Sequence, residues 1–187
     1  MDELVAAIGE CPAAPVLIAI GGFGGSGKST LAERIHRQLP NSLIIHMDDF
    51  IVKALLSQPA WDTGMFDRAR LEQQVLRPAR SGQAIIHQPL DWDSGSLGEP
   101  VQVPRADYVI VEGVSSYHED IAHYYDVKIW VDVPMDTALR RGHARPGSHE
   151  NAGYWETWTQ NDLAYFERHQ PRQAADYVFD NRADERR

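Results

Sequence analysis

A glycine-rich segment near the N-terminus has the residue types needed to bind the phosphates of a nucleotide. Gly22 to Ser29 reads GFGGSGKS and fits the pattern G-x-x-x-x-G-K-[S/T] at every position. Glycines let backbone N–H groups approach phosphate oxygens, Lys28 can reach the β- and γ-phosphates, and Ser29 offers a hydroxyl to Mg²⁺. A plain tight turn would need neither Lys28 nor Ser29. We therefore predict a site for ATP and Mg²⁺ made by Gly24, Gly25, Ser26, Gly27, Lys28, Ser29 and Thr30.

Acidic residues at the ends of two predicted strands could complete a site for phosphoryl transfer. Asp48 and Asp49 follow the apolar run 43–46, and Glu112 ends the apolar run 108–111. The carboxyl ends of parallel strands form the edge at which open α/β folds bind ligands. One carboxylate at this edge could orient an attacking hydroxyl and accept its proton, and another could hold Mg²⁺. The alternatives are a turn or helix cap for the Asp pair and a cap on the next segment for Glu112.

A group of arginines follows the apolar run 127–133. Arg141 and Arg145 are four residues apart and would share one face of a helix, with Arg140 beside them. Guanidinium groups in such a place could close over the phosphates and stabilise the charge that develops on the transferred group. The alternative is a solvated helix surface. We expect catalytic roles for Arg141, Arg145 and Lys28.

Histidine and aromatic residues are interpreted without a special chemical role. The eight histidines show no spacing typical of metal ligands, so we predict no transition-metal site and expect ordinary polar residues at His46, His87, His118 and His123. Four aromatic residues recur at helical intervals near the C-terminus, and we interpret them as packing residues in preference to a base-stacking platform: Trp155, Trp158, Tyr165 and Phe166.

Composition limits the class of partner. The chain has 187 residues, of which 43% are hydrophobic, which suits one domain with one core. Its net charge of -9 excludes a basic surface for nucleic acid, and Cys11, as the only cysteine, excludes an intrachain disulfide. The acidic N-terminus does not resemble a signal peptide, and no apolar run is long enough for a membrane span. We expect a cytoplasmic protein with a small-molecule partner; the oligomeric state stays open.

Strands and helices alternate along the chain. Apolar runs predict strands at 16–20, 43–46, 108–111, 127–133 and 177–179, and helical periodicity predicts helices after the glycine-rich loop, from Phe66-Asp67 to about 80, around 138–139, and at 154–169. This alternation favours a three-layer α/β/α sandwich with a mainly parallel sheet. The segment from about 50 to 104 is expected to be an excursion on the acceptor side, with a hairpin through Val101 and Val103.

In combination, five segments resemble the uridine kinase and phosphoribulokinase superfamily, to which nicotinamide riboside kinases belong. They are Gly22 to Thr30, HMDDF at 46–50, Phe66-Asp67, Val111-Glu112-Gly113, and the stretch from Val131 to Arg145. The resemblance extends from about Pro15 to Asn181. It implies a single P-loop NTPase domain over 1–187 with strand order 2-3-1-4-5 and a small helical lid at about 140–153. It also implies transfer of the ATP γ-phosphoryl group to a primary alcohol, commonly the 5′-hydroxyl of a ribosyl compound.

The resemblance also implies roles for single residues. Asp48 matches the catalytic base, which makes Asp49 the weaker candidate, and Glu112 matches the acid near Mg²⁺. Asp67 resembles the acid that binds the ribose diol. The two arginines resemble those that close over the phosphates, and the segment 177–181 is similar to the final strand and turn near the adenine.

The chain departs from this family on the acceptor side. Uridine kinases have an aromatic residue, an Asp, a His and an Arg where this chain reads LDWDSGSL at 90–97, without the His or the Arg. Nicotinamide riboside kinases have an arginine at the position of Gly142. Asp91 and Trp92, with Asp93, stay candidate acceptor contacts, and a solvated loop is the alternative. We expect a nucleoside or ribosyl acceptor. A sugar or pantothenate-like alcohol is the alternative acceptor, and an ATP-binding regulatory switch is the alternative of another class.

Overall fold

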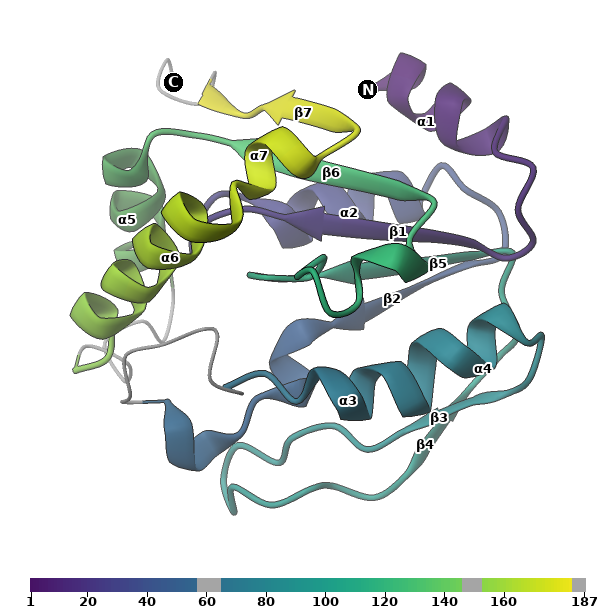
Figure 1. Ribbon diagram of the computed structural model, residues 1–187, viewed down its shortest axis with the longest axis horizontal. Helices are drawn as coiled ribbons and strands as arrows, with labels where there is room; N and C mark the ends of the chain where they lie inside the picture. Colours follow the sequence, from purple (N-terminus) through teal and green to yellow (C-terminus); the bar gives the residue numbers. More distant parts are fainter. Residues whose placement is uncertain (57–64, 146–152, 183–187) are drawn as a thin grey trace.

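The protein is an α/β fold built on a five-stranded parallel sheet. The computed structural model describes residues 1–56, 65–145 and 153–182. The sheet has the order β2-β5-β1-β6-β7 (Figure 1), which reads 2-3-1-4-5 when its strands are counted along the chain. This is the order that the family resemblance implies. The strands are β1 (Val16–Gly21), β2 (Ser42–His46), β5 (Tyr108–Glu112), β6 (Val127–Asp132) and β7 (Tyr177–Asp180).

The register of the central strands decides which residues meet at the edge of the sheet. All six residues of β1 are buried, as its unbroken apolar run predicts for a strand covered on both faces. Ile20 of β1 pairs with Glu112 of β5, and Glu112 pairs with His46 of β2. The strands run in the same direction, so the loop after Gly21, the segment after His46 and the segment after Glu112 all begin at one edge.

Helices cover both faces of the sheet and complete three layers. One face packs against α1 (Asp2–Gly9) and α2 (Lys28–His36) through a cluster that includes Ile18 and Ile35. The opposite face packs against a continuous helical segment and a long helix through a cluster that includes Val75 and Tyr165. These elements are α3 (Arg68–Leu71), η4 (Glu72–Leu76), α4 (Arg77–Arg80) and α6 (Trp155–His169). The predicted fold class is confirmed, whereas α1, which buries only Leu4 and Ile8, was not predicted.

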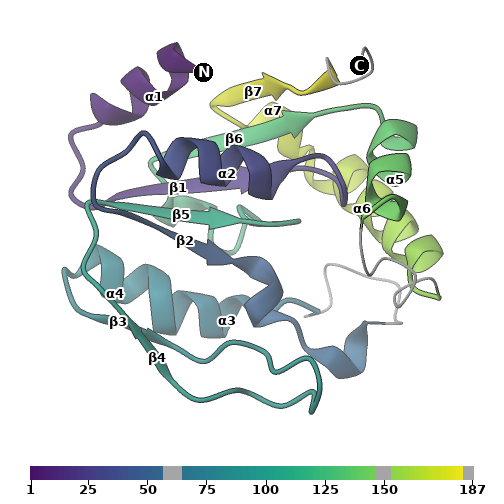
Figure 2. The same ribbon diagram turned by 180° about the vertical axis from the view of Figure 1, so that it is seen from behind.

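The pair of β3 (Ile85–His87) and β4 (Val101–Val103) lies beside the helical segment that contains α3 and α4 (Figure 2), and short helical elements connect the strands. η1 (Met47–Phe50) and η2 (Lys53–Leu55) follow β2, and β3 pairs antiparallel with β4, which confirms the predicted hairpin. η5 (Ala122–Tyr124) precedes β6, and α5 (Met135–His143) follows it. Residues 57–64 of the expected excursion and 146–152 of the expected lid lie outside the described residues.

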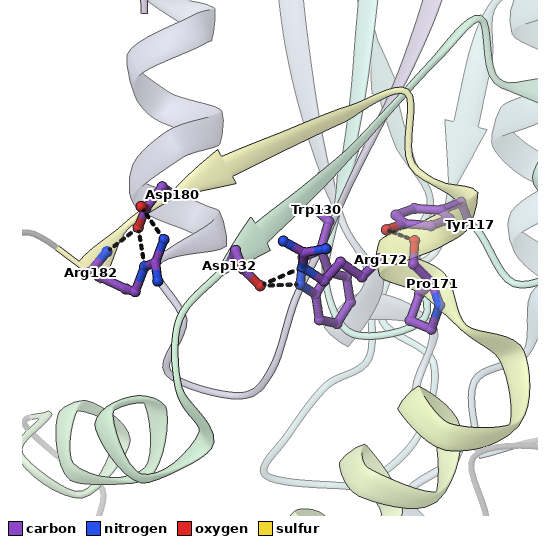
Figure 3. Close-up of polar contacts among 7 residues, drawn as sticks. All are labelled: Tyr117, Trp130, Asp132, Pro171, Arg172, Asp180 and Arg182. Atoms are coloured by element: carbon purple, nitrogen blue, oxygen red, sulfur yellow. Dashed lines mark hydrogen bonds and ion pairs between the residues drawn. The ribbon is translucent and has the colours of Figure 1, made fainter.

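Polar contacts hold the C-terminal part of the chain against the sheet (Figure 3). Trp130 Nε1 donates to Asp132 Oδ1 at 3.3 Å, and Arg172 Nε of α7 (Pro171–Ala174) donates to the same oxygen at 3.1 Å. Tyr117 Oη donates to the carbonyl oxygen of Pro171 at 3.0 Å. These bonds join α7 to β6 and to the segment after β5. Within the three described ranges, no helix has both the length and the hydrophobicity that crossing a bilayer requires.

Candidate active site

The glycine-rich loop connects β1 to the N-terminus of α2 and has the shape of an anion site. Gly25 (φ +84°) and Gly27 (φ +97°) have left-handed backbone conformations that favour glycine. A side chain on Gly25 would also overlap the carbonyl oxygen of Ala138 in α5. The first N–H groups of α2, from Lys28 onward, have no intrahelical acceptor. The N-terminus of α2 therefore offers backbone donors and a positive helix end to a phosphate.

Ser29 and Glu112 meet at the base of this loop. Ser29 Oγ donates to Glu112 Oε1 at 3.1 Å, and His46 Nδ1 lies 2.7 Å from the same oxygen. Burial alone would raise the pKa of Glu112, but the hydrogen bond with His46 and the charge of Lys28 outweigh it, so that pKa is lowered. The same hydrogen bond raises the pKa of His46. An ionised carboxylate beside a hydroxyl is an oxygen donor set that suits Mg²⁺.

Asp48 and Lys28 line the same pocket as Ser29 and Glu112. Asp48, in η1, is an exposed residue that lines the pocket. The protein atoms around its carboxyl group raise the pKa of Asp48 by desolvation; Glu112 raises it further, and Lys28 opposes the rise. Burial lowers the pKa of Lys28 against the opposing charges of the acids around it, and Lys28 Nζ donates to the carbonyl oxygen of Phe23 at 3.0 Å. A proton acceptor and a phosphate-binding cation thus share one cavity.

The neighbouring carboxyl group of Asp49 lies elsewhere. Its Oδ2 is 3.6 Å from Nε2 of the buried His87, and it is not among the pocket-lining residues of the described part. The geometry therefore favours Asp48 over Asp49 as the base, in agreement with the family resemblance.

A third carboxylate reaches the phosphate loop from α6, and sequence reasoning missed it. Asp162 is 5% exposed, and its Oδ2 accepts a hydrogen bond from the backbone N–H of Gly24 at 2.7 Å. Burial raises the pKa of Asp162 to about 6, although the bond from Gly24 and the charge of Lys28 oppose the rise. Trp155 and Trp158 line the same pocket. The spacing of 155, 158 and 162 puts all three on one helical face, and this spacing is the sequence signal that could have identified Asp162 as a neighbour of the two tryptophans.

The pocket is lined largely by apolar residues. Its wall contains Trp92, a predicted acceptor contact, and Phe66, which belongs to one of the segments of the family resemblance. It also contains Trp155 and Trp158, for which the helical spacing predicts a packing role. The other apolar members are Ile51, Leu56, Met65, Val114, Met135 and Leu139. Such a wall suits an acceptor with a flat or apolar body.

Two of the predicted acceptor acids are engaged in local structure. Asp67 caps α3, since its Oδ1 accepts the backbone N–H of Arg70 at 2.9 Å. Asp91 organises its own loop: its carboxylate accepts bonds from the backbone N–H of Asp93 at 2.9 Å and from the hydroxyl of Ser94 at 2.7 Å. Neither carboxylate is in the described pocket wall. Asp67 is thus a helix cap and Asp91 stabilises its own loop, two local roles that aspartate commonly has.

The two predicted arginines separate. Arg145 lines the pocket, whereas Arg141 Nη1 donates to the carbonyl oxygen of Asn181 at 3.0 Å. Asn181 in turn donates from Nδ2 to the carbonyl oxygen of Ser26 at 2.8 Å, so Arg141 supports the phosphate loop from outside. Gly142 lies between the two arginines in the sequence. Trp155 packs so closely against it that a Cβ added to Gly142 would lie 2.7 Å from Cζ3 of the Trp155 ring.

Sequence comparison finds kinases. A nicotinamide riboside kinase from Eremothecium gossypii is 26% identical over 164 residues, which cover 75% of this chain and 68% of that protein. A uridine kinase from Ureaplasma parvum serovar 3 is 26% identical over 157 residues, which cover 78% and 76%. A uridine kinase from Brevibacillus brevis is 29% identical over 137 residues, which cover 68% and 64%. No protein-family model matches the chain.

Solved structures show the same fold. A possible uridine kinase from Bacillus stearothermophilus superposes with a TM-score of 0.68 at 22% identity, covering 96% of each chain. Shikimate kinase from Bacteroides thetaiotaomicron, at 17% identity, has a TM-score of 0.50 over 88% of this chain and 85% of that one. The comparisons confirm the predicted P-loop kinase fold, the predicted resemblance, and the predicted class of phosphotransferase.

Proposed function

We propose that the protein transfers the γ-phosphoryl group of ATP to a hydroxyl of a nucleoside or another ribosyl compound, most naturally its 5′-hydroxyl. The observation that carries this proposal is that Asp48, Lys28, Ser29 and Glu112 all line one pocket. Phosphoryl transfer needs an oriented alcohol, a proton acceptor and positive charge on the phosphates, and this pocket contains groups suited to each need.

Each polar residue has a distinct task in this reaction. Asp48 orients the acceptor hydroxyl and accepts its proton while the acceptor oxygen bonds to the γ-phosphorus and the bond from that phosphorus to ADP breaks. Its raised pKa makes the ionised carboxylate a better proton acceptor than an aspartate with an ordinary pKa. Lys28 and Arg145 attract the phosphate oxygens. Ser29 and Glu112 would hold Mg²⁺, which supplies charge neutralisation when bound.

The apolar wall supports a ribosyl acceptor that has a flat body. Trp92, Trp155 and Trp158 offer ring surface against which a base can pack. The carboxylate of Asp48 then remains available to accept the proton of the acceptor hydroxyl. The proposal also includes a lid over about 140–153 that carries Arg145. It further includes a cytoplasmic setting, where ATP is supplied and Cys11 stays reduced.

An assay of ATP consumption in Mg²⁺ tests the proposal. Ribonucleosides, pyridine ribosides, sugars and pantothenate would be compared as acceptors, with Lys28→Ala as the blank. We expect stimulation by a ribosyl compound that the blank lacks. Stimulation by sugars or pantothenate alone would contradict the ribosyl assignment. Tight ATP binding without any acceptor, together with a protein partner whose affinity depends on ATP, would favour a regulatory switch.

Asp48→Asn and Asp49→Asn form a matched pair for the base. The first should lower kcat by about two orders of magnitude or more while ATP affinity changes little. The second should keep most of the activity, because Asp49 lies beside His87. Equal losses in the two variants would remove the basis for assigning Asp48.

A further inference from the structure

Two segments that are distant in the sequence lie side by side near the end of α6. Tyr117, in the segment after β5, donates its hydroxyl to the carbonyl oxygen of Pro171 at 3.0 Å (Figure 3). His118 and His169, which lie next to this contact, have ring centroids 4.6 Å apart. The C-terminal end of α6 is therefore held against the segment that follows Glu112.

Three side chains at this contact offer metal-binding atoms. One ligand atom each from His118, Glu119 and His169 lies within 4.8 Å of the other two. Two imidazoles and a carboxylate suit transition ions such as Zn²⁺, which often binds three protein ligands and a water. Ligand atoms of a tetrahedral site are about 3.4 Å apart when each is about 2.1 Å from the ion. Glu119 is exposed, so it can rotate to close the remaining distance.

His118 provides a second, independent observation. Its side chain is nearly fully buried, at 4% exposure, and Nδ1 lies 3.2 Å from a carboxylate oxygen of Asp120 and 3.3 Å from the backbone nitrogen of the same residue. In the tautomer that has its proton on Nδ1, this nitrogen donates to the carboxylate and Nε2 has its lone pair available for a metal ion. The other ring nitrogen, Nε2, is buried and has no hydrogen-bond partner in the described part of the chain. A carboxylate at one ring nitrogen and a metal ion at the other is the usual arrangement around a ligating histidine. Arg68 lies nearby, and Asp120 neutralises its charge at 2.8 Å.

We propose that His118, Glu119 and His169 form a binding site for a transition-metal ion of the Zn²⁺ class. The ion satisfies the buried Nε2 of His118 and joins the end of α6 to the segment after β5. α6 also carries Trp155, Trp158 and Asp162 in the pocket wall, so the ion would stiffen the support of that wall. The site has no part in the proposed phosphoryl transfer. Our expectation from the sequence that the histidines have no metal role changes, because the ligands lie on two segments that only the fold brings together.

Cobalt titration tests the site directly. The metal-free full-length protein would be titrated with Co²⁺ in excess Mg²⁺, with the visible absorption of Co²⁺ as the signal. We expect one equivalent of Co²⁺ with the intense bands of a four- or five-coordinate site, and displacement of this Co²⁺ by Zn²⁺. His169→Gln and Glu119→Gln should each weaken binding at least about tenfold. His123→Gln, at an exposed histidine outside the cluster, should leave binding unchanged.

Two outcomes would overturn the proposal. One is the absence of saturable Co²⁺ binding, in which case a buried water is the better partner for Nε2 of His118. The other is equal binding by wild type and His169→Gln, which would place the ion at another group such as His46 and Glu112. Because His118→Gln alters a buried residue, the more accessible ligands carry the test. Zn²⁺ should also raise the Tm of wild type and leave that of His169→Gln unchanged.

Discussion

The carboxylate of Asp162 accepts a hydrogen bond from the backbone N–H of Gly24 at 2.7 Å, although the two residues are 138 positions apart in the sequence. This bond joins α6 to the loop that we expect to bind phosphates. It also puts a buried acid beside a site for anions, an arrangement that disfavours the ionised form of Asp162.

Asp162→Asn should change how stability depends on pH. The pKa of Asp162 is about 6 in the folded protein against an ordinary value of 3.8. The folded state therefore binds more protons between these values, and the stability that Asp162 contributes is complete at low pH and lost as pH rises through about 6. Between pH 5 and pH 7.5, the free energy of unfolding of wild type should fall by about 1–2 kcal/mol more than that of the variant.

Urea denaturation at the two pH values measures this difference. Asp107→Asn, at an exposed aspartate, is the matched control and should follow wild type. Parallel pH dependence in wild type and Asp162→Asn would show that this carboxyl group does not titrate with a raised pKa.

Ser29→Ala and Glu112→Gln should weaken the response to Mg²⁺. Each variant loses one oxygen donor of the pair that lies 3.1 Å apart, so the Mg²⁺ concentration for half-maximal activity should rise at least about tenfold. Mg²⁺ titration of the initial rate at saturating ATP is the measurement. Glu33→Gln, on the exposed face of α2, serves as the control. An unchanged Mg²⁺ requirement in both variants would exclude this pair as the metal site.

Substitutions of Arg145 and Arg141 should have different effects on turnover, stability and ATP affinity. Arg145→Gln removes a cation from the pocket and should lower kcat at least about tenfold with little loss of stability. Arg141→Gln removes the bond to Asn181, which supports Ser26, so it should lower Tm and ATP affinity more than kcat at saturating ATP. Steady-state kinetics with thermal denaturation would separate the two. The same profile in both variants would contradict their different positions.

Gly142→Ala should affect the acceptor more than ATP. The added methyl group would press on the indole of Trp155 and move it in the pocket wall, so the KM of the acceptor should rise several-fold, with a smaller change for ATP. In a Trp155→Ala background the same substitution should do no further harm, because helical alanine is about 1 kcal/mol better than glycine. Additive losses in the double variant would mean that the two residues act independently.

Local patterns in the sequence predicted the sheet, the phosphate loop and the order of the segments. The unbroken apolar run of β1 and the spacing of Lys28 and Ser29 are local properties, and each favours one structure whatever the rest of the chain does. The position of Asp48 and Glu112 at strand ends was also predictable, because parallel strands end at a common edge.

The acceptor side depended on the tertiary structure. Asp67 and Asp91 had the right chemical type for a binding role, but a carboxyl group bonds equally well to a nearby backbone N–H, and the local fold used them in that way. Asp162 and Trp155 read as members of an ordinary amphipathic helix, since nothing local shows what faces them. The sequence determined the chemistry of the phosphate site through short-range spacing. The packing of α6 against the loop decided which carboxylates and rings reach the pocket, because contacts between distant segments depend on the whole fold.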